Sequence, residues 1–188
     1  WSMRIISGKF KGKKINLPKD KTTRPLRDLV KESLFNVIRH SNKINININN
    51  SVILDLFAGS GSFGLEALSR GAKKCLFVEN YLNAFMLLNK NIKKLKCHDS
   101  CILTKLDCFK FVENLQKNEL NLDIIFLDPP YREEKINFLI EKILKKNILN
   151  ENGIIIIHRH RKDNIKITEK LNVIDLRLYG VSKIIFGN

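Results

Sequence analysis

The most informative stretch of the chain is residues 52–64, Val-Ile-Leu-Asp-Leu-Phe-Ala-Gly-Ser-Gly-Ser-Phe-Gly. A short apolar run carries an acid, Asp55, and is followed by Gly59, Gly61 and Gly64 in the spacing G-x-G-x-x-G. An apolar strand, a glycine turn and a helix in this order are typical of the first unit of a nucleotide-binding α/β sheet. The stretch therefore predicts a parallel sheet with a cofactor at its glycine turn.

The same alternation of apolar runs and helical stretches continues towards the carboxyl terminus. The expected strands are residues 52–57, 75–79, 101–105, 123–128 and 153–158, and the expected helices are residues 62–70, 81–95, 107–117 and 133–147. Two final runs, 173–178 and 183–186, have no helix between them and predict an antiparallel hairpin. The predicted fold class is α/β, a Rossmann-like doubly wound sheet with an antiparallel carboxy-terminal edge hairpin.

Residues 1–50 precede this pattern and predict a small basic extension to a main domain at residues 51–188. Within the extension, residues 4–17 predict a short hairpin, and Pro25 is expected to open a helix. The Asn-rich residues 41–51 fit an edge strand or, preferably, a polar connector. The apolar side chains of the expected helix recur every three or four residues and form one stripe: Leu26, Leu29, Val30, Leu34, Val37 and Ile38.

The composition favours a globular protein with a polyanionic partner. Hydrophobic residues make up 44% of the chain, and no apolar run approaches the roughly 20 residues that a membrane-spanning helix needs. Lys and Arg exceed Asp and Glu by 34 to 19, a net charge of +15, and residues 1–31 are especially basic. Such a cluster favours nucleic acid, and a solvated lysine-rich surface is the alternative. The residues expected to contact nucleic acid are Arg4, Lys9, Lys11, Lys13, Lys14, Arg24, Arg27 and Lys31.

The glycine loop alone does not identify its cofactor, because Glu79 also fits the ribose-binding acid of a dinucleotide site. However, Asp55 would repel a pyrophosphate and attract the ammonium and sulfonium of S-adenosylmethionine. We therefore expect S-adenosylmethionine, with Glu79 accepting its ribose hydroxyls and Asp107 its adenine amino group. Capping is the alternative role for Asp55 and Asp107. The expected cofactor-binding residues are Asp55, Phe57, Ala58, Gly59, Ser60, Gly61, Glu79, Asn80 and Asp107.

A second motif, Asp128-Pro129-Pro130-Tyr131, ends the expected strand at 123–128. The Asp128 carboxylate and the Pro129 carbonyl can each accept an N–H from one exocyclic amine of a base, which directs its lone pair at a methyl donor. The prolines hold the loop rigid, and Tyr131 offers a face on which the base can stack. The four residues are therefore the expected catalytic group, and a capped Pro-Pro turn is the structural alternative.

The four cysteines form no C-x-x-C pair and indicate reduced thiols, as in the cytoplasm. Cys97, His98 and Cys101 are close in sequence but lack a fourth ligand at a usable spacing. We therefore expect neither a disulfide framework nor a bound metal.

Several motifs together resemble one enzyme family. They are Met3-Arg-Ile-Ile-Ser-Gly-Lys9, Lys11-Gly-Lys13, Arg24-Pro25, Asp28, Val30-Lys-Glu-Ser-Leu-Phe-Asn36, residues 55–69 and Asp128-Pro-Pro-Tyr131. With these motifs the chain is similar, over nearly its whole length, to the RsmD family of 16S ribosomal RNA guanine-N2 methyltransferases.

The resemblance implies methyl transfer from S-adenosylmethionine to the exocyclic N2 amine of a guanine in 16S ribosomal RNA. The substrate is expected to be RNA in a partly assembled small subunit, and the enzyme a cytoplasmic monomer without a membrane partner, whose basic start grips the RNA. Two departures concern substrate contacts. Leu26 and Arg27 stand where the family has small hydroxyl residues, and residues 158–162, His-Arg-His-Arg-Lys, stand where it has acids. The second segment fits a phosphate-binding patch or a solvated loop.

Other functions fit part of the sequence. A DNA amino-methyltransferase acting on adenine N6 or cytosine N4 would use the same four-residue motif, but it generally needs an added recognition domain. An RNA-binding or nicotinamide-binding protein of the same fold, without methyl transfer, is the second alternative. Asp55, Glu79 and Asp128 argue against it.

Overall fold

The computed structural model describes residues 2–20 and 25–188 and contains a seven-stranded sheet in the order β5-β4-β3-β6-β7-β9-β8. Strands β3 to β7 run parallel, whereas β9 runs antiparallel to both β7 and β8. The predicted fold class and the final hairpin are confirmed. The strands are β3 (Val52–Asp55), β4 (Lys74–Val78), β5 (Cys101–Thr104), β6 (Leu122–Leu127), β7 (Leu149–His160), β8 (Val173–Tyr179) and β9 (Ser182–Gly187).

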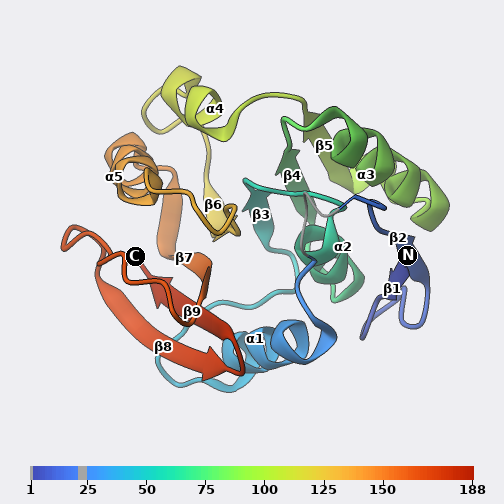
Figure 1. Ribbon diagram of the computed structural model, residues 1–188, viewed down its shortest axis with the longest axis horizontal. Helices are drawn as coiled ribbons and strands as arrows, with labels where there is room; N and C mark the ends of the chain where they lie inside the picture. Colours follow the sequence, from blue (N-terminus) through green and yellow to red (C-terminus); the bar gives the residue numbers. More distant parts are fainter. Residues whose placement is uncertain (1, 21–24) are drawn as a thin grey trace.

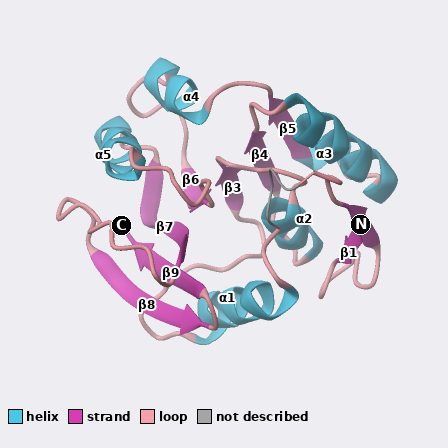
Figure 2. Cartoon of the chain, in the orientation of Figure 1, coloured by secondary structure: helices cyan, strands magenta, loops and turns pink. Residues whose placement is uncertain are grey.

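Helices cover both faces of this sheet (Figure 1). One layer holds α1 (Asp28–His40), α2 (Ser62–Ser69) and α3 (Leu82–Leu95), and the other holds α4 (Cys108–Asn114) and α5 (Ile136–Lys146). A short 3-10 helix, η1 (His98–Ser100), precedes β5. Figure 2 shows the strands between the two groups of helices.

The two helical layers explain why the strands are apolar without alternation. In β7, Ile154 and Ile156 join the core on the α1–α3 side, while Ile155 and Ile157 join the core on the α4–α5 side. A parallel strand that is buried on both faces needs apolar residues at successive positions. None of the helices among the described residues is both long and apolar enough to cross a membrane.

The amino-terminal segment forms the expected hairpin, with β1 (Ser2–Arg4) paired antiparallel to β2 (Lys14–Asn16). Ile5, Phe10 and Ile15 of this segment are buried in the same core as α1, α2 and α3. The expected extension and the expected main domain therefore share one hydrophobic core.

The segment after the hairpin differs from the prediction at the start of its helix and at one residue of its apolar stripe. The helix does not open at Pro25, because Arg27 has an extended backbone (φ −61°, ψ 147°) and α1 begins at Asp28. Leu29 belongs to the expected apolar stripe but is 71% exposed. The Asn-rich residues 41–51 form a connector without strand pairing, as preferred from the sequence.

A buried ionic cluster fixes the hairpin to the helices. Glu66 of α2 accepts hydrogen bonds from the backbone N–H groups of Ile6 (2.9 Å) and Ser7 (3.0 Å). Its carboxylate also pairs with Arg70 (2.8 Å) and with Lys31 of α1 (3.6 Å), whose ammonium donates to the Arg4 carbonyl (3.2 Å). Glu66 and Lys31 are both fully buried. The expectation that Lys31 contacts nucleic acid is therefore wrong.

Candidate active site

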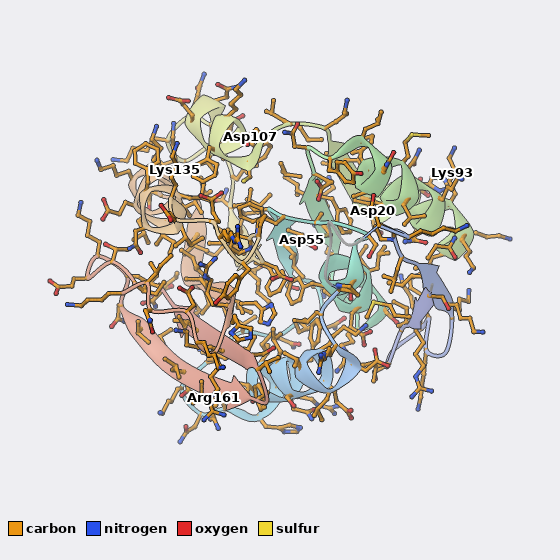
Figure 3. All side chains as sticks on the ribbon, in the orientation of Figure 1. Asp20, Asp55, Lys93, Asp107, Lys135 and Arg161 are labelled. Carbon is orange, nitrogen blue, oxygen red and sulfur yellow. The ribbon has the colours of Figure 1, made fainter. Side chains whose placement is uncertain are left out.

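Three carboxylates meet at the carboxyl edge of the sheet. Asp55 ends β3, Glu79 follows β4 and Asp128 follows β6, and β3 lies between the other two strands. The negative charges of Asp128 and Glu79 both raise the pKa of Asp55, so the three groups lie within electrostatic reach of one another. Figure 3 labels Asp55 at the centre of the molecule and Asp107 at the start of α4. This edge is where open α/β sheets bind ligands.

Asp55 is almost fully buried, and its two oxygens differ. Oδ2 accepts the Gly64 N–H (3.2 Å), so the capping alternative holds for this atom. Among the described residues, no group donates to Oδ1 although that atom is buried. Burial, followed by the charges of Asp128 and Glu79, raises the pKa of Asp55 to about 8. A buried oxygen without a donor fits the ammonium group of S-adenosylmethionine.

The glycine loop leaves room for a ligand at one position only. Gly59 (φ +55°) and Gly61 (φ +86°) both have left-handed backbones that favour glycine. A Cβ at Gly59 would meet no atom within 4 Å, whereas one at Gly61 would lie 2.4 Å from Leu88 Cδ1. Gly61 is therefore needed for packing, and the space beside Gly59 is open.

Glu79 is held by the backbone around it. Its Oε2 accepts the Gly59 N–H (2.7 Å), and its Oε1 accepts the Tyr81 N–H (2.8 Å). Each carboxylate oxygen has a second lone pair, so both can still accept a ribose hydroxyl. The carboxylate thus has the acceptors and the fixed orientation that the predicted ribose contact requires.

The remaining expected cofactor residues follow the strand ends. Ser60 is tied to the hairpin through buried Asn91, which donates to the Ser60 carbonyl (3.0 Å) and the Asn16 carbonyl (3.0 Å). Asp107 caps α4, because its Oδ1 accepts the N–H groups of Phe109 (3.0 Å) and Lys110 (3.1 Å). Its adenine contact remains a prediction. Ala58 is buried, Phe57 is half-buried and Asn80 is exposed.

Arg159 holds the loop that contains Asp128-Pro-Pro-Tyr131. Its guanidinium is almost fully buried and donates to the carbonyls of Pro130 (3.4 Å), Tyr131 (3.3 Å) and Glu133 (3.3 Å). It also pairs with Asp163. The backbone of the loop is therefore held in place by the Arg159 side chain, which comes from β7.

The side chains of this loop have different exposures. Pro129 is buried, while Pro130 is exposed and the Tyr131 residue is 55% exposed. The Tyr131 ring meets the His160 ring edge-to-face, with centroids 5.2 Å apart. An exposed aromatic ring at the carboxyl edge is available for stacking with a base.

Sequence reasoning missed the structural roles of His158 and Arg159. It treated residues 158–162 as a phosphate-binding patch or a solvated loop, but His158 Nδ1 lies 2.8 Å from Asp128 Oδ1 and Arg159 is internal. Arg161 and Lys162 are exposed, and Arg161 lies beside the β8–β9 hairpin (Figure 3). Only Arg161 and Lys162 can therefore form the phosphate-binding patch or the solvated loop that the sequence predicts.

The expected nucleic-acid residues other than Lys31 lie mainly at the surface. Lys9 and Lys13 have their ammonium groups 4.9 and 5.3 Å from the centroid of the Phe10 ring. Arg24 lies outside the described residues. The exposed members of the set are Arg4, Lys9, Lys11, Lys13, Lys14 and Arg27.

The cysteines form a close pair without a metal cluster around it. The sulfurs of Cys97 and Cys101 lie 4.0 Å apart. Within residues 2–20 and 25–188, no group of three or more His, Cys, Asp or Glu side chains could hold a metal ion.

The raised pKa of Asp55 leads to a test of the cofactor site. We expect S-adenosylmethionine binding at pH 7 to release about one proton, because an ammonium near Oδ1 would favour the ionised carboxylate. Affinity should accordingly rise as the pH goes from 6 to 7. Titration calorimetry in buffers of different ionisation enthalpy measures the release, and Asp55→Asn should abolish it. Equal binding enthalpies in all buffers would contradict this role of Asp55.

Comparisons with known proteins agree with this geometry. A family model described as Conserved hypothetical protein 95 matches residues 3–188. Ribosomal RNA small subunit methyltransferase D of Haemophilus influenzae is 32% identical over 180 residues, which cover 95% of this chain and 90% of that protein. A solved candidate methyltransferase from Escherichia coli has a TM-score of 0.82 and 25% identity, covering 100% of this chain and 97% of that chain.

A more distant structure shows how widely the fold is shared. An RNA methyltransferase from Salinibacter ruber in complex with S-adenosyl-L-homocysteine has a TM-score of 0.62 at 12% identity, covering 87% of this chain and 92% of that chain. The fold is that of class I S-adenosylmethionine-dependent methyltransferases. On its full-length family match and its identity to the Haemophilus protein, the chain belongs to the RsmD family, that of ribosomal RNA small subunit methyltransferase D.

Proposed function

We propose that this chain transfers a methyl group from S-adenosylmethionine to the exocyclic N2 amine of a guanine in small-subunit ribosomal RNA. The observation that carries the proposal is the Asp128 loop. It places one carboxylate, a rigid Pro-Pro turn and an exposed aromatic ring beside Asp55 and Glu79 at one sheet edge. The named substrate of the Haemophilus relative, small-subunit ribosomal RNA, supports the choice of RNA.

The residues of this site fit the chemistry of an aromatic amine. The amine lone pair is delocalised into the ring, and the nitrogen becomes acidic only as the new bond forms. The Asp128 carboxylate and the Pro129 carbonyl can accept its two N–H groups, orient the lone pair and stabilise the developing positive charge. Tyr131 stacks on the base. When bound, S-adenosylmethionine supplies the methyl group. Asp55, Gly59 and Glu79 are the residues that would hold this cofactor.

The proposed substrate form and cellular setting follow from charge and family. The chain carries a net charge of +15, and the exposed lysines of the hairpin suit the phosphates of folded RNA. We propose a monomer that acts in the cytoplasm on 16S RNA within a partly assembled small subunit.

The decisive experiment is transfer of labelled methyl from S-adenosylmethionine to unmethylated small subunits, naked 16S RNA and duplex DNA in parallel. Mass spectrometry of nucleosides identifies the product. N2-methylguanine on the ribosomal substrates alone is the expected result. Methyladenine or methylcytosine in DNA would support amine methylation at this site but contradict the proposed RNA substrate. Absence of transfer to every substrate would contradict the proposed activity.

The hairpin lysines provide a second test. Replacing Lys11, Lys13 and Lys14 together by alanine should weaken RNA binding and make the slope of log K against log salt less negative by about 2. Each lost phosphate contact removes about 0.7 from the magnitude of the slope for a single strand. Binding at several salt concentrations measures the slope. Lys117→Ala with Lys145→Ala, two exposed lysines on the α4–α5 side, is the control. An unchanged slope in the triple variant would place the RNA contact elsewhere.

A further inference from the structure

The His158 side chain bridges the proposed catalytic acid and a buried hydroxyl. Its Nδ1 lies 2.8 Å from Asp128 Oδ1, and its Nε2 lies 2.9 Å from Ser182 Oγ. We propose that His158 is a positioning residue for Asp128, with Nδ1–H donating to Oδ1 and the Ser182 hydroxyl donating to Nε2. The inference rests on the proposed function, because it concerns the carboxylate that accepts the amine.

Strand pairing brings the three side chains together. Leu127 of β6 pairs with Ile157 of β7, so Asp128 and His158 are the next residues on two neighbouring parallel strands. Ser182 begins β9 and pairs with His160 on the other side of β7. His158 and Ser182 belong to strands and Asp128 is the first residue after β6, so the sheet register brings the three residues together.

The chemistry of the partners decides which ring nitrogen carries the proton. An ionised carboxylate can only accept, so the hydrogen bond to Asp128 requires a proton on Nδ1. In a neutral ring Nε2 is then an acceptor, and the Ser182 hydroxyl is the donor that it faces. Ser182 is almost fully buried, so it has little access to water as another partner. In a neutral ring, this arrangement of protons satisfies both contacts.

The bond to His158 determines which Asp128 oxygen is available. Among the described residues, His158 contacts Oδ1 of Asp128, and the side chains of His158 and Asp128 are each about one-fifth exposed. Holding Oδ1 restricts rotation of the carboxylate and leaves Oδ2 for the amine N–H. His158 is on the neighbouring strand β7, so its N–H also offsets the negative charge that Asp128 contributes near Asp55 and Glu79.

Three variants of His158 separate positioning from other roles. His158→Ala should lower kcat about 10- to 30-fold without changing the Kd for S-adenosylmethionine, as expected for a lost hydrogen bond to a charged group. His158→Asn places an amide N–H where Nδ1 was and should restore kcat to within about threefold. His158→Gln places its amide at the Nε2 position, nearer Ser182, and should stay low. This rescue pattern would not follow from a general packing defect.

Other outcomes would overturn the inference. Wild-type kcat in His158→Ala would show that the contact has no effect on the reaction, and equal kcat values for the Asn and Gln variants would remove the role of Nδ1–H. A wild-type protein that transfers no methyl group would instead overturn the proposed function. The two failures are therefore distinguishable.

A spectroscopic readout tests the contact without turnover. The ¹⁵N shifts of the His158 ring, assigned by their loss in His158→Asn, should show the tautomer with the proton on Nδ1. Ser182→Ala should increase the population of the other tautomer. A wild-type ring that carries its single proton on Nε2 would overturn the inference.

Discussion

Replacing Asp128 by alanine is expected to lower kcat for methyl transfer about 10³-fold while changing the Kd for S-adenosylmethionine by less than about threefold. The variant removes the acceptor that we propose orients the amine and stabilises charge on its nitrogen. The predicted cofactor contacts of Asp55 and Glu79 remain. Single-turnover kinetics with ribosomal substrate and calorimetric titration of the cofactor measure the two quantities separately.

One control variant and one measurement of the fold make this result interpretable. Asp99→Ala removes a fully exposed carboxylate and should leave both quantities unchanged. Circular dichroism should show the same fold for both variants. Equal losses of kcat and cofactor affinity in Asp128→Ala would show that Asp128 serves cofactor binding and not the amine.

Replacing Glu66 by alanine is expected to lower the free energy of unfolding by about 3–5 kcal/mol, because it leaves a buried ion without its partner. The carboxylate accepts two backbone N–H groups of the hairpin and pairs with Lys31 and Arg70. Burial also lowers the pKa of Lys31, and without Glu66 that lysine would have to lose its proton or draw in water. Urea unfolding measures the change.

A lysine–glutamate ion pair at the surface serves as the control for the buried pair of Lys31 and Glu66. Lys166 and Glu169 are 3.0 Å apart, and both side chains are more than four-fifths exposed. Glu169→Ala should change the free energy of unfolding by less than about 1 kcal/mol. The double variant Lys31→Met with Glu66→Gln should regain part of the lost stability, because it removes both buried charges. A Glu66→Ala protein as stable as the wild type would contradict the role of the cluster.

Sequence patterns predicted the sheet well because a strand that is buried on both faces has a strong apolar signal. Helix spacing could also have identified Lys31 as buried, since it precedes Leu34 by three residues and Phe35 by four on the covered side of α1. The prediction counted Lys31 among the basic residues of the segment and did not use its position on the helix. The signal for a buried lysine is its place in the apolar stripe and not its residue type.

The roles of His158 and Arg159 could not be predicted in the same way. Their orientation depends on the length of β7, which continues to His160 because β9 pairs with it along that region. Pairing between strands that are distant in sequence leaves no local pattern. The sequence of residues 158–162 therefore resembled a basic surface segment, although its first half supports the loop of Asp128.

The buried cluster around Glu66 bears on how enzymes of this shape can change their targets. The same carboxylate that stabilises α1 and α2 also holds the backbone of the hairpin, so the hairpin is not an interchangeable module. A grafted hairpin would have to present two backbone N–H groups to Glu66 and a backbone carbonyl to Lys31 to keep these contacts. The exposed hairpin lysines, Arg161 and Lys162 lie outside this cluster, so we expect substitutions there to alter the proposed RNA contacts with the least cost to stability.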